Sequence, residues 1–123
     1  YTGLHLGNLW GESPDYANHQ SSLNGFQMRD DGDGVQRWVV AHRDPGVPNW
    51  IDTTGLPQGY LSNRWAYSTL PPKAQWPTIQ ATKVAFSEIV AMFPEGTPQI
   101  SPEQRRQQIA IRQQHVQRRF RVF

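Results

Sequence analysis

Cysteine is absent from this chain of 123 residues. Its absence excludes disulfides, iron–sulfur clusters, thiolate zinc sites and cysteine nucleophiles together. Long apolar runs are also missing: none approaches the ~20 residues that a membrane-spanning helix needs, so we expect no membrane span. The first ten residues, YTGLHLGNLW, have neither the basic start nor the unbroken apolar segment of a signal peptide. These absences leave the compartment undetermined, because a domain large enough for its own core folds in either redox environment.

Sequence signatures of catalysis and of cofactor binding are missing as well. The chain has no GxSxG motif, and its four histidines form none of the patterns HxH, HxxxH and HExxH. His5, His19 and His42 could still converge in space, because histidine spacing alone carries no geometric information here. We therefore name no catalytic residue, no metal site and no cofactor, and the sequence favours a protein that is not an enzyme.

An Asp/Gly cluster, DDGDG, occupies residues 30–34. A calcium loop of the EF-hand type needs oxygen ligands at positions 1, 3 and 5 and a glutamate at position 12. Counting from the second aspartate puts Val35 at the fifth position and no glutamate at the twelfth. The cluster is instead typical of a turn, so we predict a hairpin between residues 21–29 and 35–42. A loose surface ion site is the alternative.

Strand patterning covers the first part of the chain. Leu4 and Leu6 alternate with other residues, and residues 59–67 alternate in the same way. The long connection over residues 43–58 contains three prolines, each of which removes a backbone donor. One core suffices for a chain of this length, and we predict a β-rich body over residues 1–70.

The hydrophobic period changes after residue 72, where a helical C-terminal extension over residues 71–123 is expected. Ile79, Phe86, Ile89 and Phe93 have helical spacing, which predicts a helix over about residues 78–93. We expect the extension and the body to pack as one domain.

The start of a second helix is marked by a capping box. Ser101 can cap, Pro102 suits the first helical position, and Gln104 stands where its side chain can return a hydrogen bond. The pattern predicts a helix over about residues 102–121. Its apolar stripe, which includes Val116 and Phe120, is narrow, so such a helix needs a docking surface.

Positive charge is concentrated at the C-terminal end. Residues 1–98 carry nine acids and six bases, whereas residues 99–123 carry one glutamate and six arginines. Arg105, Arg112 and Arg119 recur every seven residues and so line one helical stripe. The aromatic–basic interleaving of single-strand binders is absent, so nucleic acid is not the expected partner. We predict instead an interface on another domain or subunit, made by these arginines with Val116 and Phe120.

Tryptophan and tyrosine gather in the first 76 residues. Such side chains mostly fill cores, because they bury a large area while the ring N–H or O–H finds a partner. The alternative is a platform for a sugar or another flat ligand, for which loop-borne Trp50 is best placed. Our candidate ligand-binding residues are Asn49, Trp50, Tyr60 and Arg64. Arg64 would be costly to bury alone, so we expect a carboxylate partner, either Asp44 or Asp52.

The segment DPGVPNWIDTTGLPQGYLSNRW, residues 44–65, holds in order Asn49, Trp50, Thr53, Gly55, Gly59 and Arg64. It resembles the C-terminal domain of a bacterial two-domain family of unknown function, in which an Asn-Trp loop precedes a strand containing an arginine. The resemblance covers about residues 1–70 and implies a β-sandwich of jelly-roll type, preceded by another β domain. We therefore expect a mostly β fold: an antiparallel, jelly-roll-like sandwich with two C-terminal α-helices.

Tyr1, in place of methionine, opens the chain within a strand-like pattern, which favours a piece of a longer polypeptide. We therefore expect a non-catalytic structural or interaction module of a larger bacterial protein. Its expected partner is an upstream domain of the same protein or a homo-oligomer mate. Two alternatives stay open: a β-sandwich domain that binds a carbohydrate or small polar ligand, and a part of an enzyme whose catalytic groups lie upstream.

Overall fold

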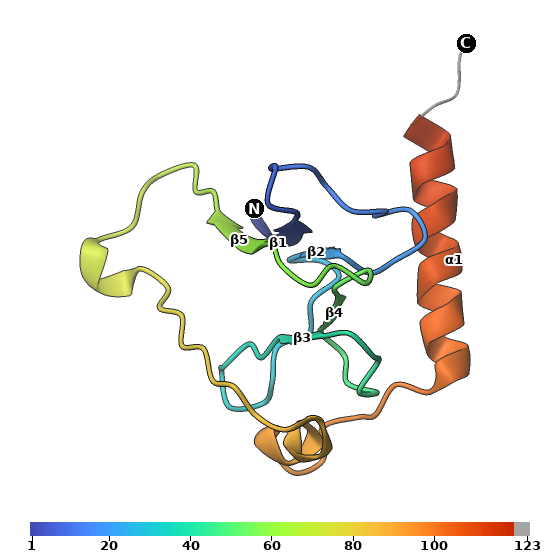
Figure 1. Ribbon diagram of the computed structural model, residues 1–123. Coiled ribbons are helices and arrows are strands. Elements are labelled where there is room, and N and C mark those ends of the chain that lie inside the picture. Colours follow the sequence, from blue (N-terminus) through green and yellow to red (C-terminus); the bar gives the residue numbers. More distant parts are fainter. Residues whose placement is uncertain (120–123) are drawn as a thin grey trace.

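The structure is a computed structural model, and it describes residues 1–119 (Figure 1). The strands are β1 (Thr2–Gly7), β2 (Ser22–Asn24), β3 (Val39–Ala41), β4 (Trp50–Asp52) and β5 (Tyr60–Trp65). Short 3-10 helices follow at Lys73–Gln75, Phe86–Glu88 and Val90–Met92. The helix α1 (Pro102–Arg119) closes the described part of the chain.

The strands form two small sheets. One is antiparallel with the order β2-β1-β5, and the other pairs β3 and β4 in parallel. The expected jelly-roll-like β-sandwich with two C-terminal helices is therefore wrong: the described residues form a small mixed α/β structure with one α-helix. The strands are too short and too few for two stacked sheets of a sandwich, and the proline-rich connections do not extend them.

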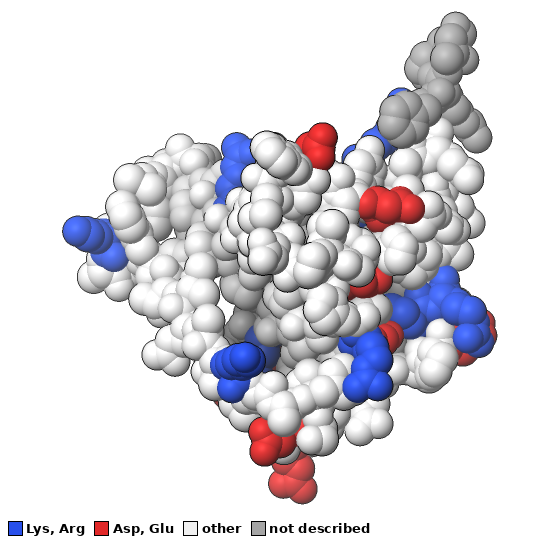
Figure 2. All heavy atoms as spheres, in the orientation of Figure 1, with Lys and Arg blue, Asp and Glu red and all other residues white. Residues whose placement is uncertain are grey.

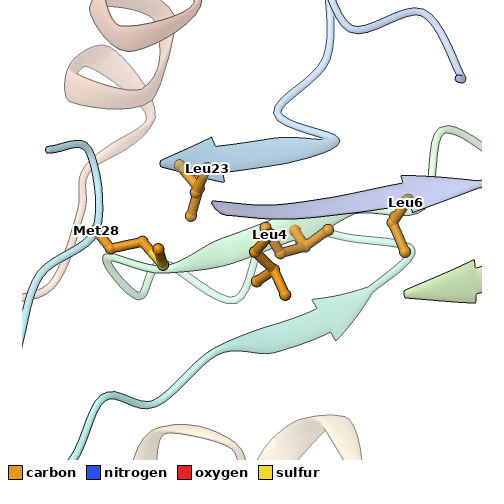
Figure 3. Close-up of a cluster of buried hydrophobic side chains, with 5 residues drawn as sticks. Leu4, Leu6, Leu23 and Met28 are labelled. Atoms are coloured by element: carbon orange, nitrogen blue, oxygen red, sulfur yellow. The ribbon is translucent and has the colours of Figure 1, made fainter. Parts of the chain in front are cut away.

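The first core cluster lies under the antiparallel sheet. Leu4 and Leu6 point to the same face of β1, as their alternation predicts, and pack with Leu23, Met28 and Ile51 (Figure 3). Ile51 comes from β4, so this cluster joins the two sheets. Its side chain is fully buried, at 0% exposure.

The predicted hairpin around the Asp/Gly cluster is wrong. β2 pairs with β1 and β3 pairs with β4, so the two segments enter different sheets. Burial of Leu23 beside Leu4 decides this, because pairing with β1 places Leu23 in the core. The cluster does form a turn. Arg37 holds it from the side, because it donates to Asp31 at 2.9 Å and to Asp33 at 2.8 Å.

The predicted helix over residues 78–93 is also wrong. This stretch contains only the 3-10 helices Phe86–Glu88 and Val90–Met92, and residues 78–85 have no regular structure. Ile89 is buried against Val47 and Trp50, and Phe93 packs beside them, which makes the second core cluster. Two single turns are enough to bring Ile89 and Phe93 to this cluster. The β-branched residues that precede the turns have low helix propensity.

The helix α1 begins as its capping box predicts. The Gln104 N–H donates to Ser101 Oγ at 3.2 Å, and the Ser101 N–H donates to Gln104 Oε1 at 2.8 Å. The helix lies along one side of the sheets, opposite to the side on which the chain leaves β5 (Figure 1). Within residues 1–119, no helix has the length and apolarity that crossing a membrane requires.

A connecting segment, residues 66–101, joins β5 to α1. Its first part swings away from the sheets in a wide loop (Figure 1). Large apolar side chains along it stay exposed, namely Tyr67, Leu70, Trp76, Ile79, Phe86, Val90 and Met92.

Candidate functional site

A hollow of about 380 Å³ lies where the two sheets meet, and we call it the sheet hollow. Its lining residues are Leu6, Gly7, Val40, Ala41, His42, Thr53, Leu56, Pro57, Gln58, Gly59, Tyr60 and Leu61. Most of them are apolar or small. The His42 ring and the Thr53 hydroxyl, whose Nδ1 and Oγ1 lie 2.6 Å apart, add a hydrogen-bonded polar pair.

Close backbone packing shapes one wall of the sheet hollow. Tyr60 pairs with Gly7 across the sheet, and a β-carbon on Gly7 would overlap the Tyr60 ring. A β-carbon on Gly59 would likewise overlap the carbonyl group of Gly7. Glycine is required at position 59, where the contact is with backbone, whereas a side chain at position 7 would displace the Tyr60 ring. Tyr60 is thus a wall residue of the hollow.

The outer edge of β5 has no partner strand among the described residues. Tyr1 and Ala66 exchange both backbone hydrogen bonds, at 2.7 and 2.8 Å. Because hydrogen-bonded pairs alternate in an antiparallel ladder, the N–H and C=O groups of Leu61, Asn63 and Trp65 point away from β1. Among residues 1–119, no other segment gives them a backbone hydrogen bond. Six backbone groups are therefore open to a further strand.

The side chain of Asn63, on the same strand, also has polar atoms that are unpaired within residues 1–119. It lies directly opposite Leu4 in the register and so on the core face of the sheet. Its Nδ2 and Oδ1 are both buried, yet neither has a hydrogen-bond partner in the part of the chain that the structure describes. Leu61, opposite Leu6 on the same face, is 41% exposed. The sequence analysis did not single out Asn63. The alternation of residues predicts a strand, but it does not show which polar side chain stays unpaired.

Asn49 and Trp50, two of the four candidate ligand-binding residues, are structural. Asn49 is 2% exposed, accepts from the Arg29 N–H at 2.8 Å, and donates to the carbonyls of Arg29 at 2.6 Å and Arg37 at 2.9 Å. Trp50 is 8% exposed, and its ring N–H donates to the Ala41 carbonyl at 3.0 Å. The Trp50 ring, predicted as the platform for a sugar or another flat ligand, is therefore buried in the second core cluster.

Arg64, the fourth candidate, is exposed on β5. The carboxylates expected to pair with it are engaged elsewhere: Asp44 binds Arg105 and Asp52 binds His19, each at 2.8 Å. Its side chain never enters the core, so it has no burial cost for a carboxylate to offset. Tyr60 and Arg64 share one face of β5, but the structure does not bring them together with Asn49 and Trp50 in one site.

Arg105 docks α1 on the body of its own chain. Its side chain is 8% exposed and donates to Asp44 at 2.8 Å and to the Val47 carbonyl at 2.7 Å. Its guanidinium carbon lies 5.2 Å from the centre of the Trp50 ring, within cation–π range. A planar fork can satisfy a carboxylate, a carbonyl and a ring face at once. We predicted an interface on another domain or subunit, but the contacts of Arg105 in the structure are made within its own chain.

Arg112 continues the same contact two turns further along α1. It donates to the Ser22 hydroxyl at 3.0 Å, to the Ser22 carbonyl, and to the Tyr16 carbonyl at 3.3 Å. Val116 is half-buried on this side of the helix, and Arg119 lines a second hollow beside β1. Phe120, the last predicted interface residue, lies outside the described residues.

The histidines do not converge. His19 Nδ1 lies 2.8 Å from Asp52 Oδ2, His42 bonds Thr53, and His5 meets the Tyr60 ring edge-on at 6.4 Å. No group of three or more histidine, aspartate or glutamate side chains within residues 1–119 is placed to hold a metal ion.

The Asp/Gly turn is stabilised by the interaction of Asp33 with Arg37. Hydrogen bonds from Arg37, and then from the Val35 N–H, lower the pKa of Asp33 to about 2. An acid held ionised by an arginine and by the turn backbone stabilises the turn. The carboxylates that could have made a surface ion site are thus used within the turn.

Comparison of the chain with protein-family models, with curated proteins and with solved structures finds no match in any of the three.

Proposed function

We propose that the chain is a non-catalytic interaction module whose body is completed by an extended segment from outside residues 1–119. The segment adds as a strand to the outer edge of β5 and covers the sheet hollow, which is the mode of recognition known as β-strand addition. Its source is an upstream β domain of the same protein or a second copy of this chain. The observation that carries the proposal is the unpaired edge of β5, which borders an apolar hollow.

The exposed surface supports the proposal. The chain exposes 9147 Å², whereas a compact monomer of 14.1 kDa exposes about 6,700 Å². The difference of about 2,400 Å² is surface that a partner can cover, and it includes the exposed connecting segment as well as the edge of β5.

The unpaired groups of Asn63 support it as well. A buried polar group that lacks a hydrogen bond costs about 1–3 kcal/mol, and Asn63 has two such atoms. The backbone of a strand laid along β5 would pair with the open edge, and a polar side chain on its core face, opposite Asn63, would supply this amide with the missing hydrogen bonds. The same strand would cover Leu61, the exposed residue on the core face. One added strand would therefore both hydrogen-bond the Asn63 amide and cover the Leu61 side chain.

Amide hydrogen exchange measured residue by residue tests the proposal. The amides of Leu61, Asn63 and Trp65 should exchange quickly in the dilute chain, because no acceptor in residues 1–119 protects them. If the partner is a second copy, they become protected as concentration rises. If it is an upstream domain, they are protected in the longer polypeptide only. Fast exchange under both conditions would overturn the proposal.

A proline substitution identifies the edge itself. Leu61→Pro removes an outward N–H without breaking the ladder with β1, and proline is tolerated on sheet edges. We expect it to abolish the concentration-dependent or domain-dependent protection of Asn63 and Trp65. Leu61→Thr keeps the N–H and the strand propensity, so it is the matched control and should retain protection.

A further inference from the structure

A second hollow, of about 210 Å³, separates α1 from the edge of the antiparallel sheet. Its lining includes Arg112, His115 and Arg119 from the helix and Tyr1, His5 and Tyr16 from the N-terminal part of the chain. We call it the basic hollow. It lies apart from the sheet hollow, and none of its lining residues is shared with that site.

Charge in the basic hollow is of one sign. Its described lining contains two arginines and no aspartate or glutamate. Elsewhere, Arg37 and Arg105 each bind a carboxylate. Arg112 differs, because its acceptors within residues 1–119 are the neutral groups of Ser22 and Tyr16. Neutral acceptors satisfy hydrogen bonds but do not neutralise the charge, and buried charges in proteins are usually paired.

The surroundings of Arg112 disfavour its charged form. Burial, and secondarily the charge of Arg119, lowers the pKa of Arg112. Attraction to an anion in the hollow would offset the cost of both. The partial negative charge at the C-terminal end of a helix is about half an elementary charge and fades within the last turn. Two full guanidinium charges outweigh it.

Hydrogen-bond donors remain for such an anion. A guanidinium has five N–H groups in a planar fork, and Arg112 uses three of them on Ser22 and Tyr16. Arg119 forms no ion pair with any residue in the described range. Arginine forks match the geometry of carboxylate and phosphate oxygens. The hollow therefore combines positive charge, spare donors and enclosed space.

We infer that the basic hollow is a binding site for a small molecule that carries an oxyanion, a carboxylate or a phosphate group, held by Arg112 and Arg119. Tyr1, His5 and Tyr16 on the opposite wall surround the rest of the molecule. This site is independent of strand addition at β5.

Titration at constant ionic strength tests the inference, with inorganic phosphate, succinate and chloride added separately to the full chain. Backbone amide shifts in Tyr16, Ser22 and His115 follow the binding. We expect phosphate or succinate to give saturable shifts there and chloride to give none. The stronger of the two oxyanions identifies the type of group that the site takes.

Arg119→Gln and Arg118→Gln are the matched variants. Both remove one charge from the same end of α1, but only Arg119 lines the hollow. Loss of one charge-assisted contact weakens binding about tenfold, so we expect that for Arg119→Gln and no change for Arg118→Gln. Shifts that never saturate, or equal weakening in both variants, would show diffuse attraction and overturn the inference. Arg112 is left intact because it also docks the helix.

Discussion

Apolar side chains are buried on the central strands of the body, residues 1–65, whereas most of those in the connecting segment, residues 66–101, are exposed, as are loop residues of the body such as Trp10 and Phe26. In the body, Leu4 and Ile51 are almost completely buried, at 1% and 0% exposure. In the connecting segment, Leu70 and Ile79 are 69% and 56% exposed. Apolar residues thus occur in both regions, but only the body has the strand pairing that encloses them. Hydrophobic content by itself does not create a core.

Backbone chemistry explains much of this difference. The connecting segment holds five of the ten prolines of the chain, and each proline removes a hydrogen-bond donor. Strands and long helices are disfavoured there, so side chains are not brought together on one face. Ile89 is the exception, because single 3-10 turns deliver it to Val47 and Trp50.

The sharpest test of the comparison truncates one isoleucine side chain to alanine in each region. Ile51→Ala empties a site in the first core cluster and should lower the free energy of unfolding by about 3 kcal/mol. Ile79→Ala removes the same atoms from an exposed side chain and should change it by less than about 0.5 kcal/mol. Urea unfolding of the isolated chain measures both. Equal losses would mean that residues 66–101 pack as firmly as the body.

Removing Asn49 tests the polar part of the body. Asn49→Ala leaves the Arg29 N–H and the carbonyls of Arg29 and Arg37 without their side-chain partner. Leaving such groups buried and unpaired should cost about 2 kcal/mol of unfolding free energy. Gln80→Ala is the control, because this amide side chain is exposed in a stretch without regular structure, where less than about 0.5 kcal/mol is expected. A ligand-contact role for Asn49, in contrast, would predict little loss of stability.

The junction between the connecting segment and α1 gives the smallest effect. Ser101→Ala removes the acceptor of the Gln104 N–H and should cost about 1 kcal/mol. Ser68→Ala, in the exposed part of the connecting segment, should have no measurable effect. Thermal unfolding followed by the helical circular dichroism signal compares the two variants. No change in Ser101→Ala would show that docking through Arg105 and Arg112 alone maintains the first turn.

Features that depend on neighbouring residues could be predicted from the sequence. The capping box joins groups only three residues apart, so local chemistry determined where α1 begins. The alternation of Leu4 and Leu6 determined the buried face of β1. The helix expected over residues 78–93 failed for a related reason: periodicity recorded that Ile89 and Phe93 face a core, but two short turns meet that requirement equally well.

Features that join distant residues were decided by the tertiary structure. Arg105 meets Asp44 across 61 positions, and Arg112 meets Ser22 across 90. The sequence alone determined that the arginines share one stripe of the helix. It could not determine that the stripe faces the body of the same chain, because a guanidinium binds any well-placed oxygen. Likewise, Asn49 and Trp50 are core residues because strands from elsewhere surround them, and the open edge of β5 exists because no described segment reaches it.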